Sequence, residues 1–193
     1  MTGSSTALGA GAVSITSGAA LDLNGQSIAG VGTLTLNGSG ISNGGALINT
    51  NATTASYSGS IAVASDSSIV AGAGSITLSS DINFGSSNSA LTFGGNIASN
   101  VNGVILGGGT TASINVASGS QWSFNRINRF ASNSTNQIKV DGTLIFGGAY
   151  GSIVDPSTGL DWLGSLAING TLKFSTGGSS LFSGVVSGAG NLI

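Results

Sequence analysis

The sequence is dominated by short triplets in which two apolar residues flank a third residue that is polar in most copies. The triplets are Val13–Ile15, Leu21–Leu23, Leu34–Leu36, Ile61–Val63, Ile76–Leu78, Ile82–Phe84, Leu91–Phe93, Val104–Leu106, Ile114–Val116, Trp122–Phe124, Ile138–Val140, Leu144–Phe146, Leu166–Ile168 and Leu172–Phe174. Side chains alternate between the two faces of a β-strand, so each triplet predicts a short strand with its outer residues buried and its middle residue facing solvent. No stretch shows the periodicity and caps of a helix.

Glycine-rich pairs separate the triplets, and they leave two all-β folds open. The pairs are Asn24–Gly25, Asn37–Gly38, Asn43–Gly44, Asn102–Gly103, Asn169–Gly170, Gly44–Gly45, Gly94–Gly95, Gly147–Gly148 and Gly177–Gly178. An Asn-Gly pair is typical of a tight hairpin, which favours an antiparallel β-sandwich. Asn also adopts the left-handed conformation and stacks in ladders, which suits the corners of a solenoid.

Three features favour the solenoid. The strands are short for a sandwich, their spacing is irregular, and the phrase Gly32–Gly38 suggests stacked equivalent coils. We therefore predict an all-β parallel β-solenoid of the right-handed β-helix type, with the antiparallel β-sandwich as the alternative. Coils of roughly 20 to 30 residues would give about six to nine coils and a rod about 30 to 45 Å long.

Composition excludes several function classes. The 193 residues contain no Cys, His or Glu, which removes thiolate chemistry and the commonest general base and transition-metal ligand. Four basic residues and a net charge of −2 provide no electrostatic footprint for nucleic acid. No apolar run approaches the roughly 20 residues of a membrane-spanning helix, so we expect no direct membrane insertion of this segment. We also predict no cofactor and no metal site.

Three stretches resemble a known repeat. They are Leu181–Ile193, which contains Phe-Ser-Gly and Gly-Ala-Gly-Asn-Leu; Leu21–Gly25 followed by Gly30–Gly38; and Tyr57–Val63. They resemble the autotransporter-associated β-strand repeat of bacterial autotransporter passenger proteins. The resemblance implies that residues 1–193 form one β-solenoid domain, a fragment of a longer passenger exported across the outer membrane to the bacterial cell surface. The absence of Cys suits that route, because early disulfides would block passage of an extended chain.

Composition changes between residues 121 and 164, where both Trp, the single Pro and most charged residues occur. We interpret residues 125–136 and 147–164 as loops that leave the rod. The candidate ligand-binding residues here are Arg126, Arg129, Phe130, Tyr150 and Trp162, because sugars stack on aromatic rings and guanidinium groups offer planar donors. With Trp122 they would form a carbohydrate or anion platform on the cell surface. We favour the alternative that the aromatic residues cover the solenoid and that Arg stems pack over them.

The same window contains Lys139, Asp141, Asp155 and Asp161. Paired carboxylates serve as acid and base in β-helix polysaccharide hydrolases and lyases, but this spacing matches no compact calcium loop, and Asp-Gly and Asp-Pro are natural turns. We therefore predict no catalytic residues and a structural or adhesive rod. The alternatives are a fibre subunit that self-associates end to end and a polysaccharide-degrading enzyme.

Overall fold

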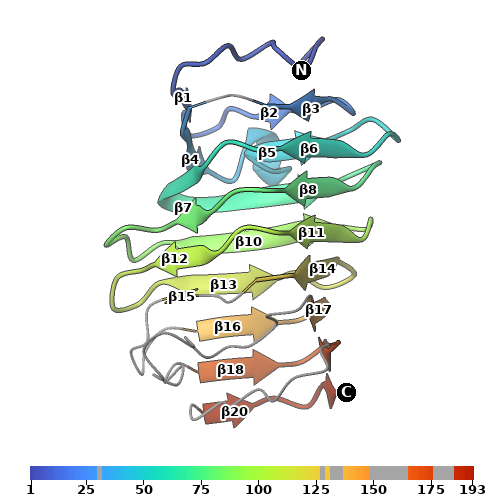
Figure 1. Cartoon of the computed structure of the whole chain (residues 1–193). Coiled ribbons are helices and arrows are strands. Elements are labelled where there is room, and N and C mark those ends of the chain that lie inside the picture. The colour runs from blue at the N-terminus through green and yellow to red at the C-terminus, as the bar shows by residue number, and fades with distance from the viewer. Residues whose placement is uncertain (30–31, 127–128, 131–136, 148–164, 176–184) are drawn as a thin grey trace.

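The computed structural model describes residues 1–29, 32–126, 129–130, 137–147, 165–175 and 185–193. These residues form an all-β solenoid of stacked coils, a coil being one circuit of the chain (Figure 1). Every strand pair in this part of the chain is parallel. The predicted parallel solenoid is confirmed, and the antiparallel sandwich is wrong.

The strands stack in three columns, which we call faces 1, 2 and 3. Face 1 consists of β1 (Val13–Ile15), β4 (Leu34–Gly38), the first part of β7 (Ile61–Ala71), β9 (Ile82–Asn83), β12 (Ile105–Gly107) and β15 (Arg129–Phe130). Face 2 consists of β2 (Leu21–Asp22), β5 (Leu47–Asn49), the last part of β7, β10 (Ala90–Gly95), β13 (Ser113–Val116), β16 (Gln137–Val140), β18 (Ser165–Ile168) and β20 (Val185–Ser187). Face 3 consists of β3 (Ser27–Ile28), β6 (Ala55–Tyr57), β8 (Ile76–Leu78), β11 (Ser99–Val101), β14 (Gln121–Phe124), β17 (Thr143–Phe146), β19 (Thr171–Phe174) and β21 (Asn191–Leu192). Six coils carry a strand on every face, and two more carry described strands on faces 2 and 3.

Strand β7 links faces 1 and 2 without interruption. Its residue Ile61 pairs with Leu34 and Ile82 on face 1. Eight residues later, Ile69 pairs with Leu47 and Phe93 on face 2. One strand of eleven residues therefore belongs to two columns and joins them into a single sheet.

The core lies inside the coils, where inward side chains of successive coils stack on one another. On face 3 the stacked register partners Tyr57, Leu78, Val101, Phe124 and Phe146 are each at most 1% exposed. Full burial of one such side chain contributes roughly 1.5 to 3 kcal/mol. The alternation seen in the triplets therefore builds one continuous apolar interior along the rod axis.

Two triplets differ from the prediction. In Val104–Leu106 the middle residue, Ile105, is the buried one, because three consecutive apolar residues carry no alternation that could fix the register. In Leu21–Leu23 the middle residue, Asp22, is only 7% exposed instead of solvated. Its register partner Ile48 lies on the next coil, and residues of that coil cover the Asp22 carboxylate.

The two ends of the described solenoid differ. Thr2 lies over the first coil, where its amide donates to the Asp22 carbonyl (2.8 Å) and its hydroxyl to the Leu23 carbonyl (2.6 Å). The last coil instead exposes apolar side chains, namely Val185, Val186, Leu192 and Ile193. The helical content of the described residues is one short 3-10 turn, Ile41–Asn43 (η1). No helix in this part of the chain is long and apolar enough to cross a membrane.

Candidate functional site

Of the five residues predicted to bind a ligand, only Arg126 has a described side chain, so their assembly into a platform stays a prediction. Arg126 follows β14 and is exposed. Arg129 and Phe130 form β15, whose backbone pairs with Leu106 and Gly107 of β12, so the expected loop at residues 125–136 includes a strand of face 1. Tyr150 and Trp162 lie outside the described residues, as does most of the expected loop at 147–164.

Trp122 cannot contribute to a surface platform. Its side chain is 0% exposed, and its ring centroid lies 4.9 Å from that of Phe93. The indole N–H donates a hydrogen bond to the Gly94 carbonyl at 3.2 Å, which satisfies the one polar group of a buried indole. The favoured packing role is therefore correct for Trp122, whereas its proposed role in the platform is wrong.

The four described aspartates share a structural role: each accepts a hydrogen bond from the following coil. Asp22 accepts from Thr50, Asp66 from Ala90, Asp81 from Val104 and Asp141 from Asn169. Carboxylates are strong acceptors, so a single outward side chain bridges two coils. The structure thus uses these carboxylates to tie successive coils together.

Asp141 is the only member of the predicted acidic cluster that the structure describes, since Asp155 and Asp161 lie outside the described residues. Its carboxylate forms an ion pair with Lys139 (Nζ to Oδ2, 2.8 Å) and accepts a bond from the Asn169 amide (2.7 Å). The Lys139 ammonium and the Asn169 amide hold the pKa of Asp141 below its usual value. The described residues contain no group of three His, Cys, Asp or Glu that could hold a metal ion.

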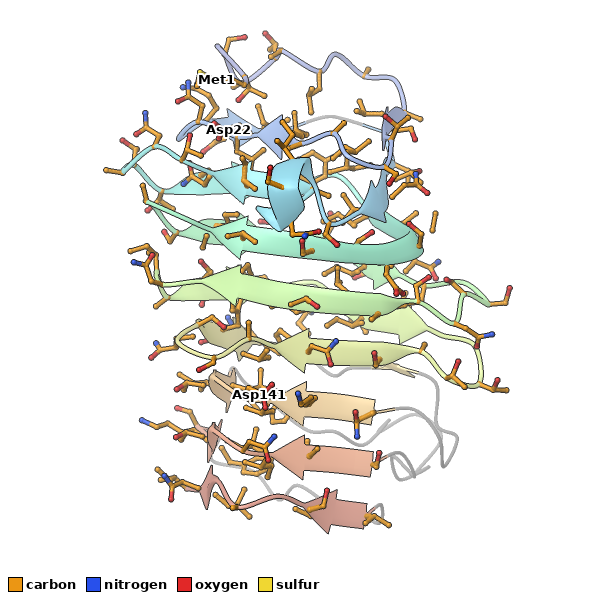
Figure 2. All side chains as sticks on the ribbon, turned by 180° about the vertical axis from the view of Figure 1, so that it is seen from behind. Met1, Asp22 and Asp141 are labelled. Carbon is orange, nitrogen blue, oxygen red and sulfur yellow. The ribbon has the colours of Figure 1, made fainter. Side chains whose placement is uncertain are left out.

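A polar groove of about 440 Å³ runs along the edge between faces 2 and 3, across four coils. We call it the corner groove. It is lined by Asn96, Ala98, Gly119, Ser120, Gln121, Asp141, Gly142, Thr143, Gly170 and Thr171. The lining includes the first residues of β14, β17 and β19 and the corners that precede these strands; Figure 2 labels Asp141 on one of these corners.

Glycine allows the corners that line the groove to stack closely on one another. A Cβ at Gly170 would lie 2.0 Å from the Gly142 carbonyl oxygen, and a Cβ at Gly142 would lie 2.2 Å from that of Ala117. Both distances are far below any real contact, so these corners approach each other too closely for another residue. The main-chain amide of Thr171 also donates a hydrogen bond to the Gly142 carbonyl (2.7 Å), which holds the two successive corners together.

The polar side chains of the groove fall into two groups. Ser120 is buried, and its hydroxyl bonds to the carbonyls of Phe93 and Ala117. The side chains of Asn96, Gln121, Thr143 and Thr171 form no hydrogen bond with the described part of the chain. The groove therefore offers two amides and two hydroxyls beside one carboxylate, which suits hydrogen bonding to a polar ligand better than acid-base chemistry.

The prediction from sequence missed this groove. The signal that could have found it is a repeat at a spacing of 28 residues: Ile138–Phe146 and Leu166–Phe174 both follow the pattern apolar, any residue, apolar, Asx, Gly, Thr, Leu, any residue, Phe. The Asx-Gly-Thr phrase of each copy places a glycine and a threonine in the groove.

Comparison of the chain with protein-family models, with curated proteins and with solved structures found no match.

Proposed function

We propose that this chain is a structural and adhesive segment of a secreted bacterial surface protein, in which the solenoid serves as a rigid stalk. The observation that carries the proposal is the unbroken parallel pairing from β3 to β21 on face 3, through eight strands. At about 4.8 Å between strands, eight levels span about 34 Å, and each added coil would lengthen the rod by the same step. A structure of this kind separates its two ends by a fixed distance.

The surface of the rod supports the same role. Outward residues on face 3 include Ser56, Thr77, Asn100 and Ser123, which are register partners on successive coils. Such side chains bind water without charge. The resemblance to the autotransporter-associated repeat supports placement of this rod on the bacterial cell surface.

We propose no enzymatic activity for this segment. Asp66 and Asp81 lie on neighbouring coils but at different corners of the solenoid, and Asp22 and Asp141 share a corner but lie five coils apart. Each of the four accepts a hydrogen bond from the next coil. A glycoside hydrolase needs two carboxylates about 5 to 10 Å apart across one substrate site. Assays of the purified chain on common polysaccharides should show no turnover; turnover that disappears in Asp141→Asn would contradict this proposal.

Surface location can be tested with antibodies raised against this chain. Intact cells of the organism that encodes it should be labelled, and brief protease treatment of intact cells should remove the label. A cytoplasmic protein of the same cells, probed before and after permeabilisation, is the control. Labelling that appears only after permeabilisation would refute the surface assignment.

One observation favours a second candidate function, a self-assembling extracellular fibre subunit. Val185, Val186, Leu192 and Ile193 are 51% to 68% exposed at the last coil, and β20 and β21 have strand partners on one side only within the described residues. Unpaired strand edges with apolar side chains promote association. Light scattering over a hundredfold concentration range separates the two: a stalk segment keeps a constant mass, and a fibre subunit grows.

A further inference from the structure

We propose that the corner groove binds a neutral oligosaccharide that lies parallel to the rod axis, with Gln121, Thr143 and Thr171 as its hydrogen-bonding partners. This inference rests on the proposed adhesive role and assigns it to the corner groove instead of to Arg126 and its neighbours. Four observations support it, namely the free polar groups, their spacing, the charge of the lining and the shape of the groove.

The free polar groups match the chemistry of sugar hydroxyls. Each Thr hydroxyl both donates and accepts, and the Gln121 amide offers two donors and one acceptor. A sugar hydroxyl is likewise a donor and an acceptor, so adjacent pairs can satisfy each other. Gln121 is exposed, and its amide has no partner in the described part of the chain. Ser120, whose hydroxyl bonds to main-chain carbonyls, is excluded from this role.

The spacing of these groups favours a linear ligand. Gln121 pairs in register with Thr143, and Thr143 pairs with Thr171, so the three side chains repeat on successive coils. Neighbouring strands are about 4.8 Å apart, which is comparable to the advance of one sugar ring along an extended chain. An oligosaccharide along the axis would therefore present similar hydroxyls to each coil.

The charge of the lining favours a neutral ligand over an anionic one. Among the described residues, Asp141 is the only ionisable one that lines the groove. Its two oxygens each use one bond, with Lys139 and Asn169, and a carboxylate can accept about four in all. The remaining positions can accept hydrogen bonds from sugar hydroxyls. The ion pair with Lys139 leaves no net charge at Asp141, so the described lining offers no positive charge that would attract uronates or phosphates.

The shape of the groove argues against a peptide. Peptides that add to sheets need an unpaired strand edge, and the strands β14, β17 and β19 beside the groove are paired on both sides. Ala98 has the only apolar side chain among the described lining residues, which therefore offer no pocket for a large apolar anchor. Its volume of about 440 Å³ lies within the usual range for small-ligand sites.

The test uses amide chemical shifts of the isotope-labelled chain. The probes are neutral hexasaccharides of glucose, galactose and N-acetylglucosamine, with a hexagalacturonate as the anionic comparison. The test variant combines Thr143→Val and Thr171→Val, which remove two groove hydroxyls at nearly constant volume. The matched control combines Thr77→Val and Thr92→Val, two half-buried outward threonines that do not line the groove. Circular dichroism first verifies that both variants fold.

At least one neutral hexasaccharide should shift the amides of Gly119, Gly142 and Gly170. The Thr143→Val and Thr171→Val variant should bind it roughly tenfold more weakly, since two hydrogen bonds are lost, and the control should bind normally. Absence of shifts with every neutral probe, shifts centred on Arg126, or preference for hexagalacturonate would overturn the inference. The antibody test of surface location uses no saccharide, so its failure and the failure of this inference are separate results.

Discussion

Substitution of Gly170 by Ala tests whether the corners of successive coils stack as closely as the structure shows. The φ angle of Gly170 is not positive, so Ala meets no penalty from backbone conformation. The added Cβ would however lie 2.0 Å from the Gly142 carbonyl oxygen and 2.6 Å from that of Asp141. Both neighbours are main-chain atoms, which cannot rotate away, so the two coils must separate locally.

The expected loss can be estimated from what that separation disrupts. Overpacking in a rigid interior costs about 1 to 3 kcal/mol. The corner also contains hydrogen bonds from the Gly170 amide to Val140 (2.8 Å) and from the Thr171 amide to Gly142 (2.7 Å). Each contributes about 0.5 to 1.5 kcal/mol. Gly170→Ala should therefore destabilise the protein by about 2 to 6 kcal/mol, a large share of the 5 to 15 kcal/mol of a typical domain.

Two other glycines separate the cost of backbone conformation from the cost of steric overlap. Gly119 has a φ of +77° but open space around a Cβ, so Gly119→Ala should cost only the backbone penalty of about 1 kcal/mol. Gly11 has open space and no positive φ, so Gly11→Ala should be neutral or slightly stabilising.

Urea unfolding followed by circular dichroism measures the three variants, and an unchanged slope shows that the midpoints can be compared. We expect Gly11→Ala to be the most stable of the three variants, Gly119→Ala to be less stable and Gly170→Ala to be the least stable. If Gly170→Ala unfolded at the same urea concentration as Gly11→Ala, the corners would not be in contact and the described stacking would be wrong.

Three further predictions concern the core and the charges. Leu34→Asp should unfold the protein or cost several kcal/mol, because Leu34 is 0% exposed, whereas Thr35→Asp should cost little; the opposite ranking of melting temperatures would mean that the strand register is reversed. Trp122→Phe should cost about 1 to 3 kcal/mol, since it removes the buried hydrogen bond to Gly94 and part of the packed ring, and a stability equal to wild type would show that the indole is not buried. Burial raises the pKa of Asp22, but hydrogen bonds from the next coil and from its own corner outweigh this effect and hold the pKa below its usual value. The folded state thus binds fewer protons, so the stability that Asp22 contributes is present above about pH 4 and is lost as the pH falls below it; Asp22→Asn should weaken this acid dependence, and an unaltered dependence would refute the assignment.

The candidate site was only partly accessible to prediction from the sequence. The threonines and glycines of the corner groove occur in a visible repeat, but a repeat does not say which residues of three coils share an edge. Trp122 shows the same limit, because a Trp beside Arg residues suits a binding platform as well as a core. Its burial depends on Phe93, 29 residues earlier, and on the carbonyl of Gly94, neither of which is a local neighbour.

The sequence by itself determined that the chain forms short strands and which side chains of most strands are buried. In Leu34–Leu36 or Ile76–Leu78, alternation of apolar and polar residues fixes the inward face locally, whatever the strand pairs with. Gly and Asn between strands likewise predicted tight corners, as at Asn24 and Gly25, where both φ angles are positive. These properties depend on the neighbours of each residue along the chain.

Only the tertiary structure decided which strands meet and what their outward side chains contact. Register partners on face 3 lie 29 residues apart for Ile28 and Tyr57 but 21 apart for Tyr57 and Leu78, because connections of different length are accommodated outside the coil. Asp22, outward by pattern, became buried because the next coil brings Thr50 against its carboxylate. Coil stacking sets such contacts through hydrogen bonds between distant residues, and no local pattern encodes their spacing.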